Sequence, residues 1–413
     1  MPGIHLKISP YQMRQTITFK FSFSSALTVL LIFCFACTSS RFNSVGNSES
    51  IKHIENNLFE ITKSGADTGT AFSIAERMKT YGVPGLSVAV FDNGKIIWSK
   101  GYGLRNAALN QPVDTATAFQ AASISKPVTT VASMRLVNKG LLKLDENINT
   151  YLRRWKLPDN EFTTDTKVTQ RRIISHTAGL SVHGFYGYNP DDTIPTIVEI
   201  LDGIRPANNA PVRVFQKPGN GETYSGGGFT ILQLAIEEVT GKTFAVAMNE
   251  LVLLPAGMRN SQFSLRVPEQ MKKNFATGYR KNGDTVDGGY HSYPEHAAAG
   301  LWTTASDLAS FMLAVGDAYR KDGGLLPRAT VKEMLTKIPG AGGLGFGIDR
   351  KGDSLRFRHS GGNEGFSCFA VSFAEIGRGA VIMTNSDNGS TLIREFLRAI
   401  SKEYNWPLMW IKE

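Results

Sequence analysis

The sequence predicts an α+β fold, in which an antiparallel β-sheet flanked by helices is interrupted by a mainly helical insertion at about residues 140–290. Two observations favour this class. Strand-like apolar runs occur near both ends of the chain, whereas the middle combines helical runs with long loops rich in Gly, Pro and Asn. Because both ends contribute to the sheet around the insertion, we expect a functional site in the crevice between the two parts.

The composition is that of a folded chain with no specialised polyanionic partner. The 413 residues are 42% hydrophobic and 20% charged, which is ordinary for a soluble globular protein and excludes a wholly disordered chain. The formal net charge is +9, but the Lys and Arg residues are scattered and form no basic stripe. We therefore expect a solvated basic surface and no nucleic-acid partner.

The first 36 residues have the pattern of an export signal. Lys7, Arg14 and Lys20 precede an apolar run of 11 residues at 26–36, which is too short to span a membrane. The sequence therefore predicts a signal peptide over residues 1–36, followed by a flexible tether over 37–60 and a globular domain over 61–413.

The end of the apolar run contains a candidate site for attaching the exported chain to the membrane. Phe-Ala-Cys at 35–37 resembles a bacterial lipoprotein cleavage site, although Cys34 stands where that pattern prefers Leu. Cys37 is therefore the lipidation candidate. We expect export to the bacterial cell envelope, either as a periplasmic protein or as a lipoprotein anchored to the membrane through Cys37.

Two hairpins and four helices are expected along the domain. The hairpins pair Leu86–Phe91 with Lys95–Ser99 across Asp-Asn-Gly, and Phe366–Phe373 with Ala380–Thr384 across a glycine-containing loop. The predicted helices cover residues 71–78, 123–139, 229–240 and 392–404. A glycine directly follows the second and the third of these, as is typical of helix C-termini.

The strongest chemical signal is Ser123-Ile124-Ser125-Lys126. Residues three apart share a helix face, so the Ser123 hydroxyl is expected near the Lys126 amine. A serine needs a base to become a nucleophile, and a lysine can be that base where its neutral form is favoured. Pro127 fits only the first turn of a helix, which places Ser123 where free N–H groups can bind an oxyanion.

Two glycine-rich segments are further candidates. Tyr224 in Tyr-Ser-Gly-Gly-Gly either points into a cleft or is a half-buried aromatic residue before a helix. His359 in His-Ser-Gly-Gly-Asn either lies beside backbone N–H groups that face a substrate or forms a surface turn. His176 and His296 have similar claims to a structural role.

Several other motifs are absent or misplaced. No His-Glu-x-x-His or P-loop pattern occurs, and the Cys-x-x-Cys spacing at 34–37 falls at the end of the export signal, so we expect no metal and no cofactor. There is no Gly-x-Ser-x-Gly nucleophile elbow, and Ser386-Asp387-Asn388 follows the histidine motif instead of preceding it. Cys368 has no disulfide partner outside the signal and is predicted to be a small buried residue.

In order and spacing, these segments resemble the serine β-lactamase-like family, which includes class C β-lactamases, D-Ala-D-Ala carboxypeptidases and related esterases. The resemblance extends from about Val83 to Asn388. It includes Val-Pro-Gly-Leu-Ser-Val-Ala-Val at 83–90, His-Thr-Ala-Gly-Leu at 176–180, Pro-Ala-Gly-Met at 255–258 and Ala-Gly-Leu-Trp-Thr-Thr-Ala-Ser-Asp-Leu-Ala at 299–309.

The resemblance implies a role for each candidate. Ser123 would be the acyl-accepting nucleophile, Lys126 its base partner, and Tyr224 a participant in proton transfer to the leaving group. The N–H groups of Ser123 and Gly362 would form the oxyanion hole, and the substrate would bind beside His359 and Gly361. The partner implied is a small-molecule or peptide substrate.

Two departures from the family pattern bear on the substrate. Gly226 replaces the Asn of Tyr-x-Asn, whose amide would contact an acyl-amide substrate, and His359 replaces the permanently charged Lys of Lys-Thr-Gly. We therefore expect an exported serine hydrolase that acts on an ester or amide through an acyl-enzyme, as an esterase or D-peptidase and not as an efficient β-lactamase. The alternative is a non-catalytic envelope protein that uses the same fold to bind or sense a ligand.

Overall fold

The computed structural model describes residues 48–61, 67–351 and 354–407. The predicted signal peptide and the lipidation candidate Cys37 lie outside the described residues. Within the described ranges, no helix is at once long enough and apolar enough to cross a membrane.

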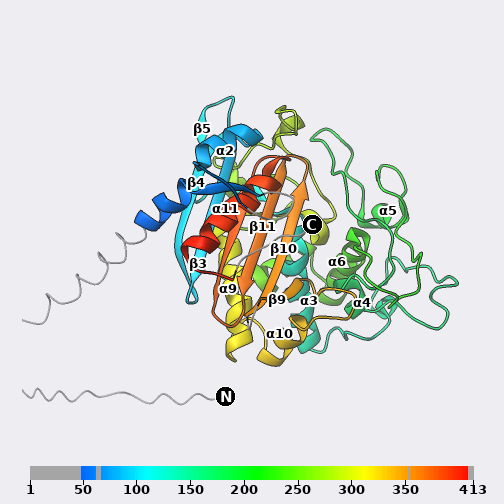
Figure 1. Cartoon of the computed structure of the whole chain (residues 1–413). Coiled ribbons are helices and arrows are strands. Elements are labelled where there is room, and N and C mark those ends of the chain that lie inside the picture. Colours follow the sequence, from blue (N-terminus) through cyan, green and yellow to red (C-terminus); the bar gives the residue numbers. More distant parts are fainter. Residues whose placement is uncertain (1–47, 62–66, 352–353, 408–413) are drawn as a thin grey trace, which may run out of the picture. The chain divides into compact units, whose positions relative to one another are not determined.

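A seven-stranded antiparallel sheet organises the unit that begins at Glu49 (Figure 1). Its order is β5-β4-β3-β12-β11-β10-β9. The strands cover Lys95–Asn106 (β4), Gln111–Pro112 (β5), Gly85–Asp92 (β3), Arg378–Thr384 (β12), Phe366–Phe373 (β11), Ser354–Asn363 (β10) and Gly347–Lys351 (β9). Both predicted hairpins are present, and β3 and β12 join them in the middle of the sheet, where Val88 pairs with Ile382. The α+β fold expected from the sequence is thus confirmed.

Both faces of the sheet are buried, because its central strands are apolar at successive positions. On β3, Val88 and Val90 face one hydrophobic cluster, and Ala89 and Phe91 face the other, as the alternation of side chains along a strand requires. Helix α11 (Gly389–Glu403) covers the first face and α9 (Ala305–Arg320) the second, with the sheet between them in Figure 1.

The segment between the two halves of the sheet is mainly helical, as predicted. It contains α3 (Ser125–Asn138), α4 (Gln170–Ile174), α5 (Ile197–Asp202), α6 (Gly226–Thr240), α7 (Phe244–Met248), a π-helix (Asn249–Leu253) and α8 (His296–Ala299). A small sheet of β6 (Phe119–Gln120), β8 (Leu301–Thr303) and β7 (Gln262–Phe263) lies among them, and α10 (Arg328–Met334) follows α9. Helices α3 and α6 each pack against α8, which brings their N-terminal regions together.

The beginning of the domain differs from the sequence prediction. Residues 48–55 are helical and Leu58–Ile61 form strand β1, whereas both were assigned to a flexible tether. Ile54 and Leu58 are buried against the sheet, and this apolar contact explains why the segment is structured. The predicted helix at 71–78 also begins later, because Asp67–Phe72 form strand β2 and Ser73 caps helix α2 (Ile74–Tyr81).

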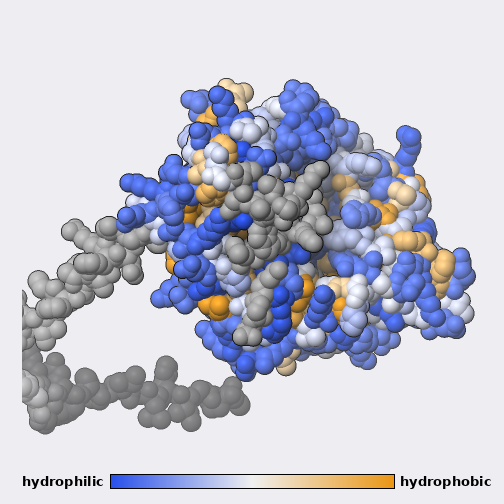
Figure 2. Space-filling model, in the orientation of Figure 1, coloured by the Kyte–Doolittle hydropathy of each residue, from blue (hydrophilic) through white to orange (hydrophobic). Residues whose placement is uncertain are grey.

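The described surface in Figure 2 is largely hydrophilic, with scattered hydrophobic residues between polar ones. Most large apolar side chains are instead in the two clusters that flank the sheet. This distribution is that of a chain whose main apolar surface is used for folding.

We predict that Glu395 on α11 holds helix α2 in place. Arg77 donates two hydrogen bonds of 2.7 Å to its carboxylate, Tyr81 donates a third at 2.6 Å, and both charged side chains are buried. Glu395→Ala would leave the Arg77 charge buried without its partner, so the free energy of unfolding should fall by about 3–5 kcal/mol in urea titrations. The exposed pair of Lys143 and Glu146 gives the control, because Glu146→Ala should change stability by about 0.5 kcal/mol or less.

Candidate active site

Ser123 lies on a tight turn directly before helix α3. Residues Ala122–Ile124 form a 3₁₀ turn and the α-helix begins at Ser125, so Pro127 falls in its first turn, as the sequence predicted. Ala122 has a φ of 48°, a left-handed conformation that costs a non-glycine residue about 1–2 kcal/mol. The residues around Ser123 are buried while Ser123 itself is partly exposed, so the turn presents its side chain to the adjoining cavity.

Lys126 is buried directly behind the Ser123 hydroxyl. Its Nζ lies 2.9 Å from Ser123 Oγ and donates a second hydrogen bond of 2.9 Å to the carbonyl of Ala298 on α8. The lysine is 2% exposed, so bulk water does not compete for these contacts. The predicted meeting of hydroxyl and amine is present.

Gly361 lets strand β10 approach the turn that carries Ser123. A Cβ at this position would lie 2.4 Å from the Ala121 carbonyl oxygen and 2.6 Å from Cys368 Sγ, both far inside contact distance. Cys368 is a free, buried thiol, as predicted, and lies 3.0 Å from the same carbonyl. Its burial raises the pKa of the thiol, which favours the neutral, unreactive form.

Strand β10 has an edge without a partner strand beside the cavity. Its pairing with β9 ends at Arg358 and Gly347, whereas its pairing with β11 continues to Asn363. Residues His359 to Gly362 therefore line the cavity from an edge whose backbone groups can meet a ligand. Nothing lies within 4 Å of the place a Gly362 Cβ would take, so the space beside this candidate oxyanion residue is open.

Tyr224 is held between two histidine rings beside Lys126. Its ring centroid lies 4.2 Å from that of His176 and 4.8 Å from that of His183, and Lys126 Nζ lies 4.9 Å from the tyrosine ring centroid. Ser225 caps helix α6, and its backbone N–H donates to His176 Nδ1 at 3.1 Å. These contacts decide between the two interpretations of Tyr224, because they place it at the cavity.

The histidines near Lys126 are disfavoured as cations. Burial, followed by the charge of Lys126, lowers the pKa of His359 to about 4. The same two causes, in the same order, hold the pKa of His176 well below its usual value of 6.5. At neutral pH both rings are neutral, so His359 provides no positive charge at the position where the family pattern has Lys.

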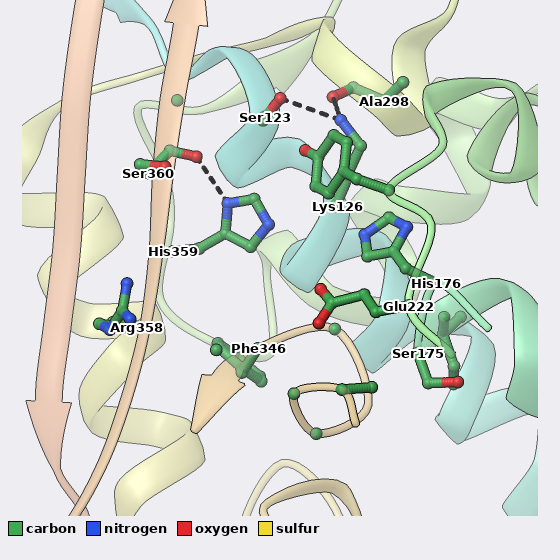
Figure 3. A pocket seen from close by; sticks show the side chains of 18 of the residues that line it. Ser123, Lys126, Ser175, His176, Glu222, Ala298, Phe346, Arg358, His359 and Ser360 are labelled. Atoms are coloured by element: carbon green, nitrogen blue, oxygen red, sulfur yellow. Dashed lines mark hydrogen bonds between the residues drawn. The ribbon is translucent and has the colours of Figure 1, made fainter. Parts of the chain in front are cut away.

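These residues surround one cavity of about 700 Å³ at the junction of the sheet and the helical segment. Figure 3 shows His176, His359 and Glu222 converging on the space next to Ser123 and Lys126. Glu222 is the only acidic residue among the described residues that line the cavity, whose cations are Lys126, Lys337 and Arg358. In the described part of the chain, no group of three or more His, Cys, Asp or Glu side chains could hold a metal ion.

The structure brings together Ser123, Lys126, Tyr224, His359, Gly361 and Gly362, all of which were predicted. Sequence reasoning missed the contact of His176 with Tyr224, the Ala298 carbonyl that orients Lys126, and the cavity residues His183, Phe185 and Glu222. His176 had a signal, since it begins the His-Thr-Ala-Gly-Leu segment. His183, Phe185 and Glu222 occupy loops whose conformation no local pattern specifies, and Ala298 lies on the short helix α8.

The chain belongs to the Beta-lactamase family, whose model matches residues 73–400. This is a family of serine hydrolases. Protein flp of Staphylococcus aureus (strain N315) is 24% identical over 319 residues, which cover 73% of this chain and 60% of flp. This chain thus spans about 60% of the length of flp. Esterase EstB of Burkholderia gladioli is 27% identical over 300 residues, covering 64% of this chain and 74% of EstB.

Solved structures share the fold. A penicillin-binding protein homologue from Pyrococcus abyssi superposes with a TM-score of 0.68 at 24% identity, covering 81% of this chain and 77% of the other. D-amino acid amidase from Ochrobactrum anthropi SV3 gives 0.65 at 22% identity, with coverage of 87% and 97%. A class C β-lactamase gives 0.63 at 21% identity, with coverage of 80% and 93%. The family resemblance seen in the sequence is confirmed.

We predict that His359 titrates far below neutral pH. The NMR signal of its imidazole, assigned by comparison with His359→Gln, should show a midpoint near pH 4, because burial and Lys126 oppose protonation. Between pH 4 and 6.5 the unfolded chain then binds more protons than the folded one, so this residue lowers the free energy of unfolding as the pH falls through that window. A midpoint at or above 6.5 would contradict the geometry around Lys126.

Proposed function

We propose that this protein is an exported serine hydrolase that cleaves an ester or amide through an acyl-enzyme on Ser123. The observation that carries the proposal is the 2.9 Å contact between Lys126 Nζ and Ser123 Oγ at the wall of an open cavity of about 700 Å³. A hydroxyl with a base at hydrogen-bond distance is the arrangement that nucleophilic catalysis requires.

In the first step, Ser123 Oγ attacks the carbonyl carbon and its proton passes to whichever member of the pair is unprotonated, a neutral Lys126 amine or a Tyr224 phenolate. The new Oγ–C bond places negative charge on the former carbonyl oxygen. We assign the N–H groups of Ser123 and Gly362 to stabilise that charge. When the tetrahedral intermediate collapses, the bond to the leaving group breaks and the leaving oxygen or nitrogen takes up the proton held by Lys126 or Tyr224.

In the second step, water attacks the acyl-enzyme carbonyl and gives a proton to the same basic group. The Oγ–C bond then breaks, Ser123 recovers its proton, and a carboxylic acid leaves. Lys126 Nζ lies 4.9 Å from the centroid of the Tyr224 ring, so the tyrosine lies beside the lysine that contacts Ser123. No metal or cofactor takes part in this scheme.

Two features disfavour efficient β-lactam hydrolysis, and the proposal is therefore an esterase or D-peptidase activity. Gly226 has no side-chain amide, and the neutral His359 cannot attract a substrate carboxylate as a lysine would. Similarity to proteins named as an esterase and as a D-amino acid amidase supports the same range of substrates. The second candidate, a non-catalytic ligand-binding or sensor protein, uses the same cavity, but binding alone does not require the Ser123–Lys126 contact.

We predict that Ser123→Ala lowers kcat/KM for p-nitrophenyl acetate by at least about a thousandfold, because Ser123 is the cavity hydroxyl that lies within hydrogen-bond distance of Lys126. A fluorophosphonate probe should label the parent protein once, and tryptic mass spectrometry should place the adduct on Ser123. Ser125→Ala provides the matched control, since the Ser125 hydroxyl is buried and accepts a hydrogen bond from Leu301 N–H at 3.1 Å. An unlabelled parent protein that still binds ligands would favour the non-catalytic alternative.

We also propose that the enzyme acts in the bacterial cell envelope, attached to the membrane through a lipid on Cys37. The proposal is supported by the basic and apolar pattern of residues 1–36 and by the Phe-Ala-Cys segment.

Expression of the full chain in a bacterial host should yield a mature protein that begins at Cys37 and carries a diacylglycerol mass in intact-mass spectrometry. Cys37→Ser should remove that mass, whereas Cys34→Ser should not. A mature chain that begins at another residue with an unmodified N-terminus would refute the lipidation of Cys37.

A further inference from the structure

A phenylalanine ring fills the space that a side chain at residue 226 would need. A Cβ built on Gly226 would lie 2.9 Å from Phe185 Cε2 and 3.4 Å from Phe185 Cδ2, with the His183 carbonyl oxygen at 3.2 Å. The backbone of Gly226 is also tied to the same loop, because its N–H donates to that carbonyl at 3.0 Å. The missing side chain at 226 is thus replaced by an aromatic ring from another part of the chain.

Phe185 stands between two hollows. It lines the catalytic cavity, and it also lines a second hollow of about 450 Å³ that shares Gly362 and Asn363 with the first. The second hollow contains further aromatic rings, from Tyr186, Tyr293 and Phe366. Tyr186 is 76% exposed, so its ring is accessible from solvent.

Charged groups in the second hollow are largely engaged with the protein itself. Asp387 accepts a hydrogen bond of 2.7 Å from the Gly365 N–H, and Glu364 pairs with Arg280 at 3.0 Å. Lys281 and Ser390 also line this hollow, and its accessible aromatic surface belongs to Phe185 and Tyr186, because Tyr293 and Phe366 are almost fully buried.

The geometry of the reaction indicates which part of a substrate reaches Phe185. The leaving group must lie near the proton-carrying groups Lys126 and Tyr224, and His359 lies on the same side, with its ring 6.4 Å from that of Tyr224. The acyl group then extends the other way along β10, toward Asn363. Phe185 lies at that end of the strand, because it lines both hollows together with Gly362 and Asn363.

We propose that Phe185 determines acyl-group specificity, and that this site prefers esters whose acyl group has an aromatic or bulky apolar body and no amide. The inference rests on the proposed acyl-enzyme on Ser123 and adds the class of acyl group. The ring of Phe185 offers an apolar face where an asparagine at 226 would have offered a hydrogen-bonding amide.

The first experiment compares two esters with the same leaving group, p-nitrophenyl phenylacetate and p-nitrophenyl acetate. The parent protein should show the higher kcat/KM for phenylacetate, and Phe185→Ala should lower the ratio of the two values by about tenfold or more, as expected for the loss of an apolar contact to the reacting substrate. Phe185→Leu should give an intermediate ratio. Phe215→Ala, which alters a half-exposed ring outside both hollows, should leave the ratio unchanged.

The second experiment restores the amide. Gly226→Asn alone should lower hydrolysis of both esters, because the new side chain and the Phe185 ring need the same space. The double variant Gly226→Asn/Phe185→Ala should fold, as seen by circular dichroism. Its ratio of kcat/KM for p-nitrophenyl N-acetylglycinate to kcat/KM for p-nitrophenyl phenylacetate should be at least about fivefold higher than the same ratio for Phe185→Ala.

The results of these experiments distinguish failure of the proposed acyl-enzyme from failure of the proposed role of Phe185. If the parent protein hydrolyses neither ester and Ser123 takes no fluorophosphonate, the proposed function fails. If the parent hydrolyses both esters but Phe185→Ala and Phe185→Leu leave the ratio unchanged, the role of Phe185 is refuted while the acyl-enzyme stands. A Gly226→Asn variant that hydrolyses both esters at parental rates would equally refute the inference that the Phe185 ring occupies the space needed by an asparagine side chain at 226.

Discussion

The contact between Gly361 and the Ala121 carbonyl sets the width of the site. With any larger residue at 361, a Cβ would lie 2.4 Å from that oxygen, and β10 would have to move away from the Ser123 turn. The strand itself cannot yield easily, since it pairs with β11 along its last eight residues. The distance between the Ser123 turn and the Gly362 backbone therefore depends on one missing methyl group, and the oxyanion assignment depends on that distance.

Behind the turn, the site concentrates one positive group among neutral ones. Lys126 is buried with its nitrogen directed at Ser123 Oγ and the Ala298 carbonyl, and the faces of Tyr224 and Phe229 lie 4.9 and 5.9 Å from it. The same charge, together with burial, lowers the pKa of His359 and His176. In the proposed mechanism the proton that leaves Ser123 goes to Lys126 or Tyr224 and not to these imidazoles, because their pKa values are lowered.

The sequence predicted those parts of the site that depend on local geometry. The Ser123–Lys126 spacing predicted the contact because both residues belong to one helical turn, and the two hairpins predicted the sheet because their turn residues are specific. Residues 48–60 were assigned to the tether although they are structured, because their polar composition obscures the two buried apolar side chains, Ile54 and Leu58. Phe185 and His176 could not be placed, because their contacts with Gly226 and Tyr224 join segments about 40 or more residues apart that no periodicity links.

Both departures from the family pattern, His359 and Gly226, replace a polar group at the edge of the cavity with a less polar one. At one end of the cavity His359 replaces a fixed positive charge with a ring that stays neutral above about pH 4. At the other end Gly226 gives its space to the Phe185 ring, so an aromatic face replaces an amide. Each change removes a polar group that would recognise a peptide-like or carboxylate-bearing substrate, while the Ser123–Lys126–Tyr224 arrangement between them is intact. This combination is the basis for the proposal that uncharged esters are the substrates, because the Ser123–Lys126–Tyr224 arrangement is retained while these two polar groups are absent.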